Sequence, residues 1–112
     1  MNKNSTRYFS HKQEKSIAKV VGGRLQANSG ATIFSKGDIQ SDNWLFEAKT
    51  CMKEQGQFTI KKEWLDKLKQ ESFAMRKEYN SLVFNFGPDT PNFYVIDEKT
   101  MIKLLKILDN EV

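Results

Sequence analysis

The first regular pattern of apolar positions lies between Ser10 and the Gly22-Gly23 pair. The spacing is that of one helix face, formed by Ile17, Ala18 and Val21. A helix is therefore predicted that ends at the two glycines. Ser10 and Gln13 match a capping box, in which each side chain bonds a backbone N–H at a helix start. Glu14 falls on the apolar stripe of the same helix.

Alternation of apolar and polar residues predicts strands next, over 24–34, 35–39 and 44–49. The first of them is interrupted at Ser29-Gly30. Residues 40–43 (Gln-Ser-Asp-Asn) have the composition of a turn. The second and third strands are therefore expected to form a hairpin.

The second half of the chain mixes helices and strands again. A polar loop over 50–57 precedes a helix over 61–77, whose apolar positions are Trp64, Leu65, Leu68 and Met75. Strands are predicted over 82–86 and 93–96, with a turn over 87–91 between them. Asp97 can cap a last helix. That helix buries a stripe that could also serve a dimer, made of Met101, Leu104, Leu105 and Leu108. The order of elements predicts an α/β fold, a sheet with helices packed on it.

Composition narrows the class of protein. With 112 residues the chain has room for a single domain, predicted over 10–112 after a flexible basic arm over 1–9. No apolar run is long enough to span a bilayer and the start lacks a signal-peptide stretch, so a cytoplasmic protein without membrane contact is expected. The chain has one cysteine and one histidine, so a metal would need oxygen ligands. A net charge of +4 is compatible with a polyanionic partner.

The predicted hairpin carries the candidate chemistry. Side chains alternate along a strand, so Glu47 and Lys49 lie on the same face. If the turn is centred between residues 42 and 43, Asp38 lies directly opposite Glu47. Like charges in that position are destabilising, and a divalent cation such as Mg²⁺ would offset the repulsion. A slip of one residue would send Glu47 to the other face.

Glu14 adds a third carboxylate to this set. A buried carboxylate is costly unless it is paired or bound to a metal. Together with Asp38 and Glu47, Glu14 would hold Mg²⁺, which activates a water and polarises a phosphoryl oxygen. Lys49 would orient that water or stabilise the developing negative charge. The set indicates phosphodiester hydrolysis. The alternative for Glu14 is an acid that favours the dipole at the start of its helix.

Asp38, a hairpin and then Glu47-x-Lys49 resembles the active-site signature of the PD-(D/E)xK nuclease superfamily. Gly37 stands where the name of the signature has proline, which is a common departure. Glu14 resembles the acid that this superfamily carries on its opening helix.

A second resemblance is to the small Holliday junction resolvases of archaea and of some bacteriophages. Ser29-Gly30-Ala31, before the aspartate strand, is similar to their serine–glycine segment, and residues 61–68 match their next helix in position. The similarity extends over residues 7–97. It implies a restriction-endonuclease-like core, with a mixed central β-sheet flanked by helices. It also implies a homodimer that cuts opposing strands of a four-way DNA junction with Mg²⁺ or Mn²⁺. Ser29 would then be catalytic or contact a phosphate; a strand bulge is the alternative.

Basic residues around the hairpin are candidate DNA contacts: Arg7, Arg24, Lys36, Lys53, Lys61 and Lys62. Solvated lysines, and an acid partner for Arg24, are the alternatives. Two other functions stay open, a related nuclease acting on duplex, flap or nicked DNA and a non-catalytic nucleic-acid-binding module. Outside this set, Cys51 is expected to be a buried or incidental thiol and His11 a surface residue. Trp44 and Trp64 are expected in the core or in a dimer interface.

Overall fold

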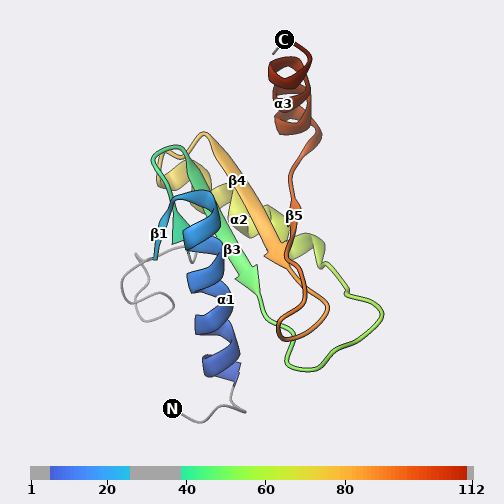
Figure 1. Ribbon diagram of the computed structural model, residues 1–112. Coiled ribbons are helices and arrows are strands. Elements are labelled where there is room, and N and C mark those ends of the chain that lie inside the picture. The colour runs from blue at the N-terminus through green and yellow to red at the C-terminus, as the bar shows by residue number, and fades with distance from the viewer. Residues whose placement is uncertain (1–5, 26–38, 111–112) are drawn as a thin grey trace.

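The computed structural model describes residues 6–25 and 39–110, in which two helices flank one sheet and a third projects away from it (Figure 1). The described elements are α1 (Thr6–Val21), β1 (Arg24–Leu25), β2 (Ile39–Gln40), β3 (Trp44–Lys49), α2 (Lys62–Ala74), β4 (Tyr79–Phe84), β5 (Phe93–Val95) and α3 (Glu98–Asn110). The predicted order, a helix, a β-meander, a helix, two strands and a helix, is confirmed. The fold is α/β, as the sequence predicts.

The sheet has five strands in the order β1-β2-β3-β4-β5. Only β3 and β4 are parallel among the described pairs, and the other neighbours are antiparallel. A parallel pair needs a crossover connection, which α2 supplies. In the hairpin, Ile39 lies opposite Phe46 and Gln40 opposite Leu45. This is the register that a turn centred between residues 42 and 43 predicts.

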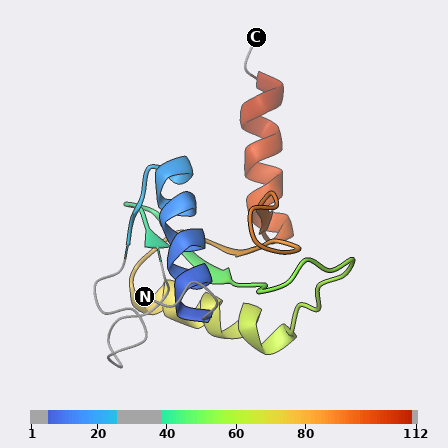
Figure 2. The same ribbon diagram turned by 60° about the horizontal axis from the view of Figure 1, so that its bottom comes forward.

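Helices α1 and α2 cover opposite faces of the sheet (Figures 1 and 2). The α1 face buries Ile17, Ile39, Phe46 and Val83, and the α2 face buries Leu45, Leu68 and Leu82. Neighbouring residues of β3 and of β4 thus point to different layers, because side chains alternate along a strand. The predicted alternation of β3, including its two ends at Trp44 and Lys49, is confirmed.

The start of α1 differs from the prediction. The helix begins at Thr6 rather than near Ser10, so residues 6–9 are helical and Ser10 is not a cap. The Ser10 hydroxyl donates to Glu14 Oε2 at 3.2 Å, one turn further along the helix. The predicted end is correct, because Gly22 takes the left-handed conformation that stops a helix, with φ +68°.

Other element boundaries shift by a few residues. Helix α2 ends at Ala74 rather than at 77, because Arg76 adopts φ +58° and the Lys77 N–H bonds the Ser72 carbonyl. Strand β4 begins three residues early, at Tyr79, because its parallel partner β3 begins opposite it. Residues 26–38, which include most of two predicted strands, lie outside the described part of the chain.

Helix α3 corrects one prediction about the core. Its predicted cap is present, since the Thr100 N–H donates to Asp97 Oδ1 at 2.8 Å, and hydrogen bonds from Thr100 lower the pKa of the Asp97 carboxyl. However, the helix projects away from the sheet (Figures 1 and 2). The predicted core stripe is therefore largely outside the core: Met101 is 45% exposed, Leu105 48% and Leu108 63%. None of the described helices is long and apolar enough to cross a membrane.

Gly87 fixes the loop after β3 against the end of β4. Its φ is +146°, and a Cβ added there would lie 2.5 Å from Glu54 Cα. The neighbouring Phe86 carbonyl accepts the Gln55 N–H at 2.9 Å, so the two backbones are held together. A side chain at this position cannot be accommodated unless one backbone moves.

We therefore expect Gly87→Ala to lower the free energy of unfolding by about 2–4 kcal/mol, from the close contact and the strained φ together. Urea titration followed by tryptophan fluorescence measures this change. Gly56→Ala is the matched control in the same loop, because a Cβ there meets nothing within 4 Å. Equal stabilities for the two variants would contradict this view of Gly87.

Candidate functional site

The Glu47 and Lys49 side chains leave β3 on the α2 face of the sheet, next to the carboxyl end of the strand. Lys49 Nζ lies 3.8 Å from Glu47 Oε2, which makes a loose ion pair. The Lys49 side chain is only 28% exposed and the Glu47 side chain only 15% exposed. Partial burial of charged groups is costly and strengthens the field that they exert. The predicted common face is confirmed for these two residues.

Trp64 of α2 forms the floor beneath the Lys49 ammonium. Lys49 Nζ lies 4.2 Å from the centre of the indole ring, and Lys61 Nζ lies 5.6 Å from it. A cation over an aromatic face is held by the ring quadrupole, so Trp64 restrains where the Lys49 charge can be placed. The indole also packs at the edge of the apolar layer, as expected for a core residue. Its contact with Lys49 is not visible in the sequence pattern.

Aromatic rings continue from Trp64 along the same end of the sheet. This aromatic cluster consists of Phe58, Trp64, Phe84, Phe86 and Phe93. The Phe58 and Phe84 rings stack with centroids 4.7 Å apart, and Phe84 stacks on Phe93 at 5.8 Å. Phe93 is 48% exposed, so the cluster, which contacts Lys49 through Trp64, reaches the surface. Sequence reasoning missed it, although aromatic residues recur at alternate positions in Phe84 and Phe86.

Gln13 attaches α1 to the carboxyl end of β3. Its side chain is 6% exposed, its amide nitrogen donates to the Lys49 carbonyl at 3.0 Å, and its amide oxygen accepts the Thr50 hydroxyl at 3.0 Å. A buried amide is tolerated because both of its ends are bonded. The sequence places Gln13 in a capping box, which is wrong. Its actual partners lie directly at the candidate site.

The structure places two of the three predicted metal ligands. Glu47 lies beside Lys49, as described above. Glu14 lies half-buried on α1, whose apolar residues pack on the face of the sheet opposite to Glu47. Asp38 lies outside the described residues, and so does Ser29. Among residues 6–25 and 39–110, no group of three His, Cys, Asp or Glu side chains is close enough to hold a metal ion. The convergence of the three acids stays a prediction.

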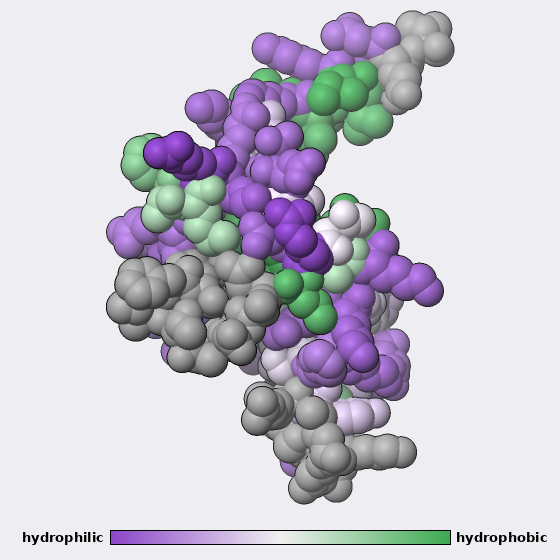
Figure 3. Space-filling model, turned by 90° about the vertical axis from the view of Figure 1, so that its left-hand side faces the viewer, coloured by the Kyte–Doolittle hydropathy of each residue, from purple (hydrophilic) through white to green (hydrophobic). Residues whose placement is uncertain are grey.

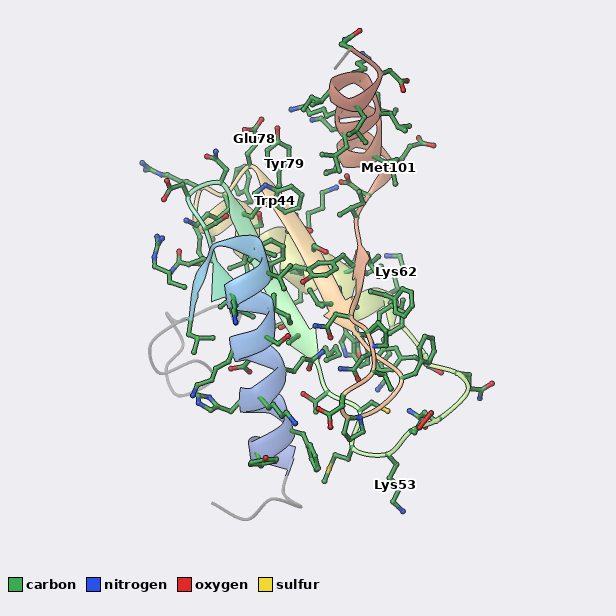
Figure 4. The ribbon with its side chains drawn as sticks, in the orientation of Figure 1. Trp44, Lys53, Lys62, Glu78, Tyr79 and Met101 are labelled. Atoms are coloured by element: carbon green, nitrogen blue, oxygen red, sulfur yellow. The ribbon has the colours of Figure 1, made fainter. Side chains whose placement is uncertain are left out.

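The candidate DNA contacts are spread over several elements. Arg24 lies 3.8 Å from the Asp42 carboxylate, the acid partner that was its alternative, with both side chains well exposed. Lys62 pairs with Asp66 at 2.7 Å on α2, and Lys53 points into solvent from the loop after β3 (Figure 4). Lys61 lies beside Trp64. Arg7 falls within α1, and Lys36 lies outside the described residues.

The two minor expectations for this region are confirmed. Cys51 is buried, with its thiol donating to the Lys53 carbonyl at 2.9 Å and accepting from Gln55 Nε2 at 2.9 Å. His11 is exposed on α1. Neither residue contacts Glu47 or Lys49 in the hydrogen bonds described, so the candidate chemistry depends on the carboxylate and the ammonium.

Comparison of the chain with family models, with curated proteins and with solved structures gives no match.

Proposed function

We propose that the protein is a metal-dependent nuclease of the PD-(D/E)xK type that cuts branched DNA. The observation that carries the proposal is the partly buried Glu47–Lys49 pair on one face of β3, restrained by Trp64. The described β2–β3 register supports it. Continued by one residue, that register would set Asp38 opposite Glu47. The mixed sheet between two helices is compatible with a restriction-endonuclease-like core.

The donor set fits a hard divalent cation. Glu47 offers carboxylate oxygens, the ligands that Mg²⁺ and Mn²⁺ take, and Asp38 and Glu14 would supply the others. When bound, such an ion activates a water and polarises a phosphoryl oxygen. Lys49 places a fixed positive charge where negative charge develops on the phosphate. Trp64 and the Glu47 carboxylate hold the ammonium in that place.

The aromatic cluster beside Lys49 favours a nucleic acid with unpaired bases. Aromatic side chains bind nucleobases by stacking, whereas the bases of an intact duplex are already stacked. A four-way junction can expose bases at its branch point, and Lys53, Lys61 and Lys62 would contact phosphates nearby. Cutting both opposing strands needs two sites, so we propose that the enzyme acts as a homodimer in the cytoplasm.

The test of the proposed function is cleavage of a synthetic four-way junction by the full chain. We expect paired nicks at symmetrical positions on opposing strands, dependent on Mg²⁺ or Mn²⁺ and abolished by a chelator. Nick positions are mapped on denaturing gels with each strand labelled in turn. The proposal would be overturned if the chain cuts neither branched nor duplex DNA in the presence of these metal ions.

The same assay separates the two competing functions. A related nuclease with another substrate would cut duplex, flap or nicked DNA faster than the junction. A non-catalytic binding module would cut none of them, and titration calorimetry with Mg²⁺ would show no binding that depends on Glu47. The partly buried Glu47–Lys49 pair favours the enzyme over the module, because a solvated strand face would not bury these charges.

Phe93 tests the stacking role of the aromatic cluster. We expect Phe93→Ala to weaken junction binding about five- to 150-fold, since a base–aromatic stack contributes roughly 1–3 kcal/mol. Fluorescence anisotropy with labelled junction, without metal, measures the change. Phe73→Ala is the matched control, because Phe73 is 86% exposed on α2 and outside the cluster. Equal effects of both substitutions would exclude a specific stacking site.

A further inference from the structure

Helix α3 presents a broad apolar face that no other described element covers. The face is made of Met101, Ile102, Leu105 and Leu108, each between 44% and 63% exposed. At helical spacing, its three lysines (Lys99, Lys103 and Lys106) fall on the other side of the helix. In Figure 3, green apolar atoms gather on α3 at the top of the molecule, beside purple charged groups. A patch of this kind marks an interaction site.

The polar side of α3 fixes which way this face points. Lys103 Nζ bonds Glu78 Oε2 at 3.1 Å and Tyr79 Oη at 3.3 Å, at the start of β4 (Figure 4). Thr100, which is 7% exposed, anchors the first turn to the body. The helix is therefore held to its own body by its polar side and its base, and most of the apolar face remains turned away from that body.

An apolar groove opens at the base of the same helix. It has a volume of about 360 Å³ and lies on the sheet face that α1 covers only in part. Its apolar lining is Val21, Trp44, Phe46, Tyr94, Ile96 and Leu104. Leu104 belongs to α3, so the apolar surface is continuous from the groove onto the helix. The apolar face of α3, called the ridge from here on, and the apolar groove thus lie side by side.

We propose that a second copy of this chain covers this surface, with the two α3 helices antiparallel and the tip of each against the groove of the other. A helix of 13 residues is about 20 Å long, so in an antiparallel pair each tip reaches the base of its partner. A two-fold axis then buries both ridges and both grooves in a single closed interface. This deepens the homodimer part of the proposed function and is tested without nuclease activity.

Two other occupants fit the surface less well. A lipid surface is flat and would cover the ridge but leave the concave groove unfilled, and the ridge has none of the aromatic residues that membrane-bound helices use. Folding of α3 onto its own groove would break the Lys103 contacts with Glu78 and Tyr79.

The experiment is sedimentation velocity of the full chain between about 1 and 100 µM, which spans micromolar dissociation constants. We expect twice the monomer mass of 13.0 kDa for the natural chain. The double variant Leu105→Glu, Leu108→Glu should sediment as a monomer with unchanged far-ultraviolet circular dichroism. Val20→Glu is the matched control, since Val20 is 73% exposed on α1, and it should stay dimeric. A monomeric natural chain, or a double variant that remains dimeric, would overturn the proposal.

A second measurement does not depend on the folding of the double variant. A photo-cross-linking amino acid in place of Leu108 should give a covalent dimer, joined to a peptide that contains Trp44, Phe46 or Tyr94 of the other copy. If all cross-linked products are intramolecular, α3 closes onto its own groove and the proposed dimer is refuted. A lipid occupant would be shown by a chain that is monomeric without lipid and pellets with anionic vesicles, if Leu105→Glu, Leu108→Glu abolishes the pelleting. That result would also refute the proposed dimer. Junction cleavage is scored separately, so failure of the dimer leaves the nuclease proposal to its own test.

Discussion

Replacement of Glu47 by glutamine is expected to abolish metal-dependent cleavage of a four-way junction. The amide keeps the shape of the side chain but loses the negative charge that a divalent cation requires. We expect the cleavage rate to fall by at least about a thousandfold, as for other groups that act directly in the reaction. Asp38→Asn should have the same effect. Single-turnover cleavage with saturating enzyme measures the rate, so that a change in affinity does not enter.

Junction binding should survive the substitution of Glu47. The carboxylate repels phosphate, so its removal should leave the dissociation constant without metal unchanged or slightly lower. Asp42→Asn is the control, because Asp42 lies in the turn before β3, at the opposite end of that strand from Lys49, and its side chain is 94% exposed, so this variant should keep full activity. Full cleavage by Glu47→Gln would remove Glu47 from the reaction. Loss of both cleavage and binding, with a normal circular dichroism spectrum, would instead indicate a binding role.

The strand that carries this site could be predicted from the sequence to the residue. In β3 the apolar residues of both faces are large, and alternation assigns Leu45 to one layer and Phe46 to the other. The turn residues between β2 and β3 then set the register. Together these two local rules place Glu47 and Lys49 on one face. No knowledge of distant contacts is needed for that step.

Contacts between elements distant in the sequence could not be predicted in the same way. The stripe on α3 has the spacing of a buried helix face, but an amphipathic pattern does not specify whether its own sheet or another molecule covers it. Among the described contacts, Lys103 joins α3 to Glu78 and Tyr79, and these pairs are 25 and 24 residues apart. The position of Trp64 under Lys49 likewise depends on how α2 crosses the sheet.

Only part of the candidate site could be predicted and checked in this way. The common face of Glu47 and Lys49 follows from the alternation of one strand, whereas the place of Asp38 opposite Glu47 stays a prediction. Glu14 comes from a helix whose place against the sheet depends on a tertiary contact, and that helix packs on the opposite face from Glu47. Gln13 makes this contact. It determines where α1, and with it Glu14, sits relative to the end of β3.

Replacement of Gln13 by alanine is expected to have the second large effect, on stability and on activity together. The Lys49 carbonyl and the Thr50 hydroxyl would each lose a buried partner, and a small cavity would form beside them. Each unsatisfied buried group costs roughly 1–3 kcal/mol, so we expect the free energy of unfolding to fall by about 2–4 kcal/mol. Urea titration measures this loss, and Lys15→Ala, at an exposed position of α1, should change stability by less than about 0.5 kcal/mol.

The reason for an effect on activity is that Gln13 holds the backbone of Lys49 itself. Cleavage should therefore fall in Gln13→Ala even at a temperature where the variant is fully folded, because a shift of about 1 Å in a catalytic group can cost on the order of a hundredfold. Gln13→Met separates the two causes, since it fills nearly the same volume without the hydrogen bonds. If methionine restores stability and activity, Gln13 acts by packing alone. If methionine behaves like alanine, the hydrogen bonds from α1 to the end of β3 position the site.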